Sequence, residues 1–128
     1  MIRGIPASDY PAVEAKVWPF LARIQRHDKD GITAQDYHQM IVNRERQLWV
    51  LGDWEAIALT LITPEAVRLE WVVGKNRHKW QDVLDDELRK WGKALGKKRL
   101  LVMARPGWAK LAKERGYREM QRAFEVKL

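Results

Sequence analysis

Four basic side chains lie together between an apolar run and a helical pattern: Lys75, Arg77, His78 and Lys79. The run "EWVVG" before them predicts a strand, and the apolar spacing after them predicts a helix. A strand, a tight turn and a helix N-terminus form an arrangement in which many proteins hold a phosphate. Such turns commonly contain several glycines, whereas this one contains Gly74 alone. The segment is therefore either an anion site that works through side-chain charge or a solvated basic connection.

The remaining composition excludes several kinds of chemistry. The chain has 128 residues and no cysteine, which excludes a thiol nucleophile, a disulfide and a cysteine-ligated zinc ion. Its three histidines do not have the short spacing of metal ligands, so we expect no metal site. No nucleophile-elbow or P-loop motif occurs, and Ser8 is the only serine that a catalytic triad would have.

The charge balance bears on the partners of the protein. A net charge of +7 is compatible with a solvated surface, or with a polyanionic partner such as nucleic acid, a phosphate-rich cofactor or an acidic protein. No helix-turn-helix or RNA-binding signature is present, so nucleic acid is permitted by charge alone. No apolar run has the length of a membrane span, and the N-terminus does not resemble a signal peptide. We expect a cytoplasmic protein of a bacterial-type cell.

The elements that would position the basic turn follow from the hydrophobic spacing. Residues 1–5 predict a short edge strand, and residues 9–27 predict a helix that Pro19 kinks or splits. Thr33 opens a second helix, with Asp36 in a capping-box position. Further strands are expected around the hairpin signal at 52–53 and at 66–74, 99–104 and 117–128. Helices are expected from Trp80 to Gly96 and at 107–116.

The order of these elements predicts an α/β (mixed α+β) fold in a single domain, residues 1–128. The segment from 66 to 104 is a strand–helix–strand unit, whose two strands we expect to be parallel neighbours joined by a right-handed crossover. The hairpin makes the preceding strands antiparallel. We therefore expect one mixed six-stranded sheet with about four helices on both faces and a central parallel pair formed by the fourth and fifth strands.

The C-terminal half carries a resemblance to a known superfamily. The segments "VRLEWVVG", "QDVLDDELRKWGKALGKKRLLVMA" and "WAKLAKERGYREMQRAFEVKL" resemble the fourth strand, third helix, fifth strand and closing elements of the GNAT acetyltransferases. The opening "MIRGIPASDYPAV" resembles the first strand and helix of that superfamily. The likeness covers most of the chain and rests on pattern. It implies a GNAT-like fold.

This resemblance implies a substrate and a site. GNAT proteins bind acetyl-CoA where the two parallel strands diverge, hold its pyrophosphate at the following turn and transfer the acetyl group to an amine. Glu70 matches the strand-four glutamate that often acts as general base there. The alternative interpretation is that Glu70 is an ordinary outward-facing residue of an alternating strand. The positions that would contact acetyl-CoA are Val72, Val73, Gly74, Lys75, Arg77, His78, Lys79 and Arg105.

The sequence also departs from the GNAT pattern. His78 and Trp80 fall near positions where the family has glycines, and aspartates follow in the next helical turns. The family's frequent acid, a tyrosine, corresponds here to Ala112. Either the basic side chains of the turn replace the backbone cradle, or the cradle is no longer used. In the second case the protein is a GNAT-fold protein without catalysis.

A narrower likeness supports that second interpretation. The chain resembles short GNAT-like proteins encoded in bacteriophage genomes, through "QLWV" before the hairpin, Trp80 and Trp91, "A…G" at Ala94 and Gly96, and "RPGW" at 105–108. This likeness implies a virion-associated or assembly role, with phage structural proteins or a second copy of the chain as partners.

Overall fold

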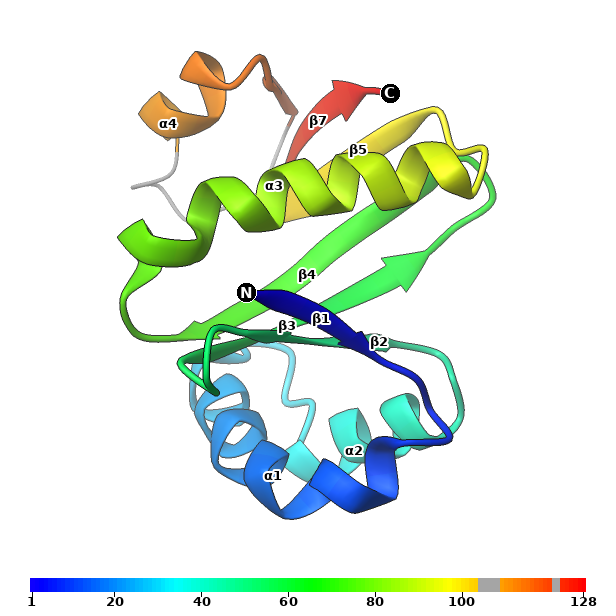
Figure 1. Ribbon diagram of the computed structural model, residues 1–128, viewed down its shortest axis with the longest axis vertical. Helices are drawn as coiled ribbons and strands as arrows, with labels where there is room; N and C mark the ends of the chain where they lie inside the picture. The colour runs from blue at the N-terminus through cyan, green and yellow to red at the C-terminus, as the bar shows by residue number, and fades with distance from the viewer. Residues whose placement is uncertain (104–108, 121–122) are drawn as a thin grey trace.

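The computed structural model describes residues 1–103, 109–120 and 123–128 (Figure 1). Its elements follow the order expected from the hydrophobic spacing. They are β1 (Ile2–Ile5), α1 (Tyr10–His27), α2 (Ala34–Val42), β2 (Gln47–Leu51), β3 (Ala56–Ile62), β4 (Ala66–Gly74), α3 (Arg77–Ala94), β5 (Arg99–Met103), α4 (Ala109–Glu114), β6 (Arg118–Met120) and β7 (Ala123–Lys127).

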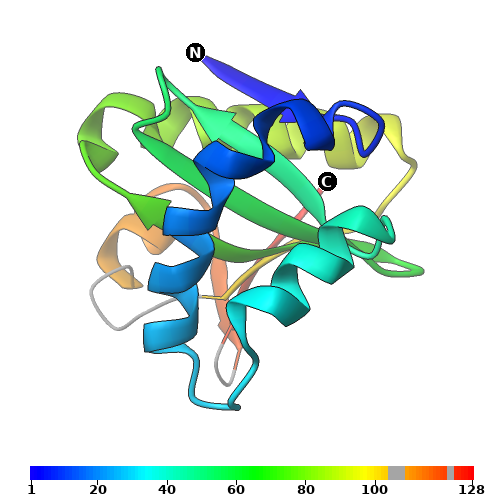
Figure 2. The same cartoon turned by 90° about the horizontal axis from the view of Figure 1, so that it is seen from below.

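The strands form one mixed sheet in the order β1-β2-β3-β4-β5-β7-β6. β4 and β5 are parallel, and every other neighbouring pair is antiparallel. Helices α1 and α2 cover one face of the sheet and α3 covers the other, as the two views in Figures 1 and 2 show. The predicted fold class and the central parallel pair are confirmed.

The part of the sheet that the structure describes has seven strands, one more than expected. The final alternating segment divides into β6 and β7. Strand β7 pairs with β5 on one side and with β6 on the other. The physical reason is the length of β5. Its five residues pair with Ala123–Lys127, so the preceding residues would lack backbone partners unless they folded back as β6.

Two apolar clusters hold the layers together. Between the sheet and α3 the cluster includes Trp49, Trp80 and Leu88, and between the sheet and the α1–α2 layer it includes Val17, Ile41 and others. Trp49 and Trp80 are buried in the first cluster, and Trp91 packs against it partly buried. Among the described helices, none is long and apolar enough to cross a membrane.

The first two helices show how local sequence sets their limits. Helix α1 continues through Pro19, so that residue does not split it. Pro19 is exposed, and water can therefore satisfy the carbonyl that its missing N–H leaves unpaired. The predicted capping box of α2 is confirmed: the Asp36 amide donates to Thr33 Oγ1 at 3.1 Å, and the Thr33 amide donates to Asp36 Oδ2 at 2.9 Å.

Candidate functional site

Strands β4 and β5 diverge halfway along β4. Their parallel ladder runs from Ala66–Arg99 to Leu69–Val102, and within the described residues β4 continues to Gly74 without a β5 partner. One edge of the end of β4 therefore offers backbone N–H and C=O groups that no neighbouring strand of the described sheet uses. An extended ligand with amide groups can add to such an edge.

Glu70 lies at the point of divergence, in a β-bulge. The register with β3 shifts between Leu59 and Thr60: Leu59 pairs with Trp71, and Thr60 pairs with Leu69. Glu70 therefore has no partner residue on β3. Because of the bulge, consecutive side chains lie on one face: Glu70 bonds to Arg46 just after α2, and Trp71 bonds to Tyr37 within α2. Alternation from Leu69, which packs under α3, places the Glu70 carboxylate on the α1–α2 side, and the bulge keeps Trp71 on that same side.

Arg46 holds the Glu70 carboxylate by a two-point ion pair. Arg46 Nε donates to Glu70 Oε1 at 2.8 Å, and Arg46 Nη2 donates to Oε2 at 3.1 Å. The two side chains are only 15% and 19% exposed. A carboxylate has about four lone-pair sites, so a ligand can still donate a hydrogen or a proton to Glu70 while the pair is intact. The sequence alone did not predict Arg46 as the partner of Glu70, because 24 positions separate the two residues.

The turn after β4 is fastened to the start of β3. A Cβ placed on Gly74 would lie 2.3 Å from both Ala56 Cβ and the Glu55 carbonyl oxygen, and Gly74 has a φ of +147°. The Lys75 amide donates to the Glu55 carbonyl at 2.9 Å, and Asn76 Nδ2 donates to Glu55 Oε2 at 2.5 Å. Gly74 thus allows β4 to approach β3 closely, because a side chain at this position would overlap β3.

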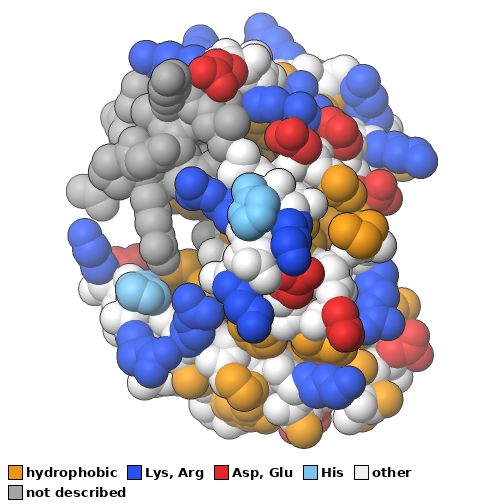
Figure 3. All heavy atoms as spheres, turned by 60° about the vertical axis from the view of Figure 1, so that its left-hand side comes forward, with side chains coloured by type: hydrophobic (Ala, Val, Ile, Leu, Met, Phe, Trp, Pro, Cys, Tyr) orange, Lys and Arg blue, Asp and Glu red, His pale blue; other side chains and the backbone are white. Residues whose placement is uncertain are grey.

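Trp80 lies beneath this turn, inside the core. It is 3% exposed, and its indole N–H donates to the Lys75 carbonyl at 2.8 Å. Its ring therefore supports the turn from the sheet side and leaves the outer side to Lys75, Arg77, His78 and Lys79, which are all exposed. Figure 3 shows Lys, Arg and His side chains together on the face that includes the start of α3.

The aspartates that follow the turn are bound by arginines. Arg115, just after α4, contacts Asp85 at 2.6 Å, Asp86 at 2.5 Å and Asp82 at 3.7 Å. These carboxylates raise the pKa of Arg115, chiefly through the hydrogen bond with Asp85. The Tyr117 hydroxyl also donates to Asp85, and burial together with this bond raises the pKa of Tyr117. The negative charge that the sequence placed near a phosphate site is thus largely compensated.

A second polar network lies near Glu70. Trp71 Nε1 donates to the Tyr37 hydroxyl at 2.9 Å, and that hydroxyl donates to Asp28 Oδ2 at 2.5 Å. Burial and the bond to Asp28 raise the pKa of Tyr37, with a smaller effect from the charge of Glu70. The Tyr37 hydroxyl therefore stays protonated at neutral pH, held by Asp28 just after α1 and by Trp71 of β4.

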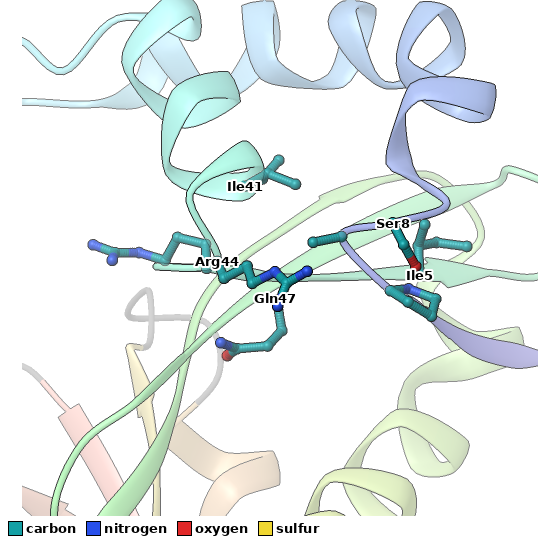
Figure 4. A pocket seen from close by; sticks show the side chains of 8 residues that line it. Ile5, Ser8, Ile41, Arg44 and Gln47 are labelled. Atoms are coloured by element: carbon teal, nitrogen blue, oxygen red, sulfur yellow. The ribbon is translucent and has the colours of Figure 1, made fainter.

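A pocket of about 390 Å³ lies beside Arg46, between the β1–α1 corner and the α2–β2 connection (Figure 4). It was not predicted from the sequence, because its two walls are far apart in the chain. Its lining residues are Ile5, Pro6, Ala7, Ser8, Ile41, Arg44, Arg46 and Gln47.

The other expected site residues have ordinary structural surroundings. Val73 is 5% exposed in the cluster under α1 and α2, and Val72 packs against the cluster under α3, so only their backbone groups are available to a ligand. Arg105 and the "RPGW" segment lie outside the described residues. Within the ranges that the structure describes, no group of His, Cys, Asp and Glu side chains has the arrangement of a metal site.

Comparison with known proteins identifies the fold. No protein-family model matches the sequence, and no curated protein is similar to it. Among solved structures, the aminoglycoside 6'-N-acetyltransferase from Enterococcus faecium matches with a TM-score of 0.73 and 12% identity over 99% of this chain and 96% of that chain. A GNAT acetyltransferase from Staphylococcus aureus Mu50 matches with a TM-score of 0.69 and 11% identity over 100% and 99%.

A third similar structure comes from a complex. A chain of the AtaT–AtaR complex bound to DNA matches with a TM-score of 0.56 and 14% identity over 70% of this chain and 72% of that chain. Together with the divergent β4–β5 pair, these similarities show that the protein has the fold of the GNAT acetyltransferases.

Proposed function

We propose that the protein is an acetyl-CoA-dependent N-acetyltransferase of the GNAT type. The observation that carries this proposal is the divergence of β4 and β5 at the Glu70 bulge. A carboxylate lies at the divergence, and an exposed cationic turn lies at the end of the same strand. The carboxylate would face the acceptor amine, the divergence would take the acetyl group, and the cationic turn would bind the phosphates of acetyl-CoA.

The residues around the divergence fit the chemistry of acetyl-CoA. The edge of β4 at Val72 and Val73, which has no β5 partner among the described residues, offers backbone hydrogen bonds to the amide-containing arm. Lys75, Arg77, His78 and Lys79 surround the N-terminus of α3, where positive side chains and the helix dipole both favour a pyrophosphate. The role of Gly74 is to let the turn approach β3, so this turn would bind phosphate mainly through side-chain charge. The same proposal includes Arg105 as a further cation.

Glu70 is the candidate general base. Acetyl-CoA supplies the acetyl group as a thioester, whose carbon–sulfur bond breaks as the carbon–nitrogen bond of the product forms. The amine must lose a proton in that step, and Glu70 can accept it through a lone pair that Arg46 leaves free. Ala112 stands where many GNAT enzymes have an acid, so the leaving thiolate would take its proton from solvent.

Acetyl-CoA binding tests the proposal directly. We expect calorimetry to detect binding by the wild type and a Kd about tenfold higher for the double variant Lys75→Ala/Lys79→Ala, because two phosphate contacts are lost. Lys90→Ala/Lys93→Ala removes the same charge from exposed positions farther along α3 and should leave the Kd unchanged. The absence of any binding heat or thermal shift at millimolar acetyl-CoA would overturn the proposal.

A second candidate is a GNAT-fold protein without catalysis. The observation that favours it is the two-point ion pair of Glu70 with Arg46, which already engages both oxygens of that carboxylate. The likeness to bacteriophage-encoded proteins belongs to this candidate, as do a virion-associated location and phage structural partners, all of which stay predictions. Binding of acetyl-CoA without release of free thiol in the presence of a broad panel of amines would favour it.

A further inference from the structure

The pocket beside Arg46 is positively charged. Its lining contains two arginines, two neutral polar side chains and four apolar residues, and no acidic residue. Arg46 is paired with Glu70, but the described part of the chain offers the Arg44 side chain no ion-pair partner. The pocket therefore carries about one uncompensated positive charge.

The backbone of the α2–β2 connection is bent so that both arginines reach the pocket. Arg44 has a φ of +63°, in the left-handed region that residues with side chains seldom adopt. The bend is fixed by hydrogen bonds of the Glu45 and Arg46 amides to the Met40 carbonyl, at 2.8 and 3.2 Å. Together with the bond from the Arg44 amide to the Ile41 carbonyl at 3.1 Å, these bonds form the Schellman motif that commonly ends a helix, so the positive φ of Arg44 follows from the end of α2.

Arg46 connects the pocket with Glu70. Its guanidinium has five N–H donors, and three hydrogen bonds occupy it: two to Glu70 and one from Nη1 to the Glu45 carbonyl at 3.0 Å. Donors are therefore left for a second anion while the pair with Glu70 stays intact. Arg46 thus lines the pocket and also holds the Glu70 carboxylate, so one guanidinium separates a ligand on its remaining donors from Glu70.

We propose that this pocket binds the carboxylate of the amine acceptor, so that the acceptor is a small aliphatic amino acid rather than a simple amine. Arg44 and Arg46 bind the carboxylate, and Ser8 and Gln47 add hydrogen bonds. Ile5, Pro6 and Ile41 contact the aliphatic part of the acceptor. The site itself stands on the pocket alone, whereas its assignment to the acceptor rests on the proposed acetyltransferase function.

The test is a binding measurement without acetyl-CoA. The ¹⁵N-labelled protein is titrated with 5-aminovalerate, valerate and pentylamine to about 50 mM, a range that detects weak millimolar affinity. We expect both carboxylates to shift the side-chain Nε–H signal of Arg46 and the amide signals of Ser8 and Gln47. Pentylamine, which has no carboxylate, should not shift them.

Variants identify the binding group. Arg44→Asn removes the charge but tolerates a positive φ, and should raise the Kd for 5-aminovalerate about tenfold. Arg23→Asn removes the same charge from an exposed position of α1 that does not line the pocket, and should leave the Kd unchanged. The dispersion of the same spectra shows whether each variant is folded.

Three results would overturn the site: no shift with either carboxylate, equal shifts with pentylamine, or an unchanged Kd in the folded Arg44→Asn protein. The outcome is separate from that of the acetyl-CoA experiment. Carboxylate binding without acetyl-CoA binding would keep the anion site and remove the acetyltransferase proposal. Acetyl-CoA binding without carboxylate binding would keep the acetyltransferase proposal and remove the anion site.

Discussion

At the scale of single residues, Glu70 and Arg46 are 24 positions apart in the sequence and form the polar centre of the candidate site. The pair orients the carboxylate and compensates its charge, because both side chains are mostly withdrawn from water. For the proposed acetyltransferase, the pair also sets a condition on catalysis: the amine must approach Glu70 on a lone pair that the arginine does not use. The pair thus influences stability and chemistry together.

The first prediction concerns this pair. Glu70→Gln should lower the free energy of unfolding by about 1–3 kcal/mol, since it leaves the Arg46 guanidinium mostly buried without its charge partner. If the protein is an enzyme, kcat should fall by about 10²-fold or more. Urea denaturation and thiol release measure the two effects. The control Glu65→Gln removes a carboxylate that is 61% exposed and pairs with Arg99 at 3.3 Å, and it should change stability by less than about 0.5 kcal/mol.

The second prediction concerns pH and the tyrosines. Burial, with a smaller effect of Glu14, raises the pKa of Tyr10 to about 12, and burial raises the pKa values of Tyr37 and Tyr117 as well. A hydroxyl whose pKa is higher in the folded state stabilises the protein fully below its unfolded pKa of 10.0. That contribution is lost as pH rises from about 10 toward 12 and above.

Thermal unfolding between pH 8 and pH 12 measures this loss, which should reach about 1.4 kcal/mol per pH unit for each tyrosine. Tyr10→Phe should give a shallower decline than the wild type above pH 10, because one of the titrating groups is absent. Absorbance at 295 nm follows ionisation of the folded protein. Tyrosinate formation near pH 10 in the folded wild type would contradict the prediction.

At the scale of elements, the turn between β4 and α3 has a structural role and a proposed binding role. Gly74, Lys75 and Asn76 fasten it to Glu55 at the start of β3, and Trp80 supports it from the core. Its cationic side chains remain exposed. A turn of fixed shape with exposed positive charge is suited to an anion, since little conformational entropy is lost on binding.

The third prediction tests the close approach at this turn. Gly74→Ala should lower the free energy of unfolding by about 3 kcal/mol or more, because its Cβ would overlap Ala56 and its φ of +147° disfavours a side chain. Gly96→Ala is the matched control. Gly96 also has a positive φ, of +73°, but a Cβ there would meet no atom within 4 Å, so only the backbone strain of about 1 kcal/mol applies. Equal losses in urea denaturation would show that the contact with β3 contributes nothing.

At the scale of the whole molecule, one carboxylate links α3 to the C-terminal elements. Asp85, which is 15% exposed, contacts Arg115 and accepts a hydrogen bond from Tyr117, while Arg89 approaches it at 3.1 Å from the next turn of α3. Arg89 Nη2 also donates to the Arg115 carbonyl at 2.6 Å. These contacts fix the end of α4 and the start of β6 against the helix that follows the proposed phosphate-binding turn.

The fourth prediction tests this link. Asp85→Asn should lower the free energy of unfolding by about 2–3 kcal/mol and increase amide hydrogen exchange at residues 112–118, because the charge that Arg115 and Tyr117 share is removed. Asp82→Asn should change both quantities little, since Asp82 is 70% exposed and lies 3.7 Å from Arg115. Unchanged exchange in Asp85→Asn would mean that apolar packing alone holds α4 and β6 in place.

The sequence by itself determined the fold class. Hydrophobic spacing marks the strand at 66–74 and a helix from Trp80 to Gly96, which the structure has as Ala66–Gly74 and Arg77–Ala94. A strand–helix–strand order leaves a right-handed parallel pair as the normal outcome. Thr33 and Asp36 even fixed the start of α2, because a capping box involves residues three positions apart. These features are local, so they can be read along the chain.

Only the tertiary structure decided how the candidate site is built. The partner of Glu70, the pairing of the aspartates with Arg115, the inward direction of Trp80 and the pocket between residues 5–8 and 41–47 each join segments distant in sequence. The split of the last strand into β6 and β7 depended in the same way on the length of its neighbour β5. Ion pairs and pockets depend on distances in space, and no spacing along the chain contains those distances before the sheet has formed.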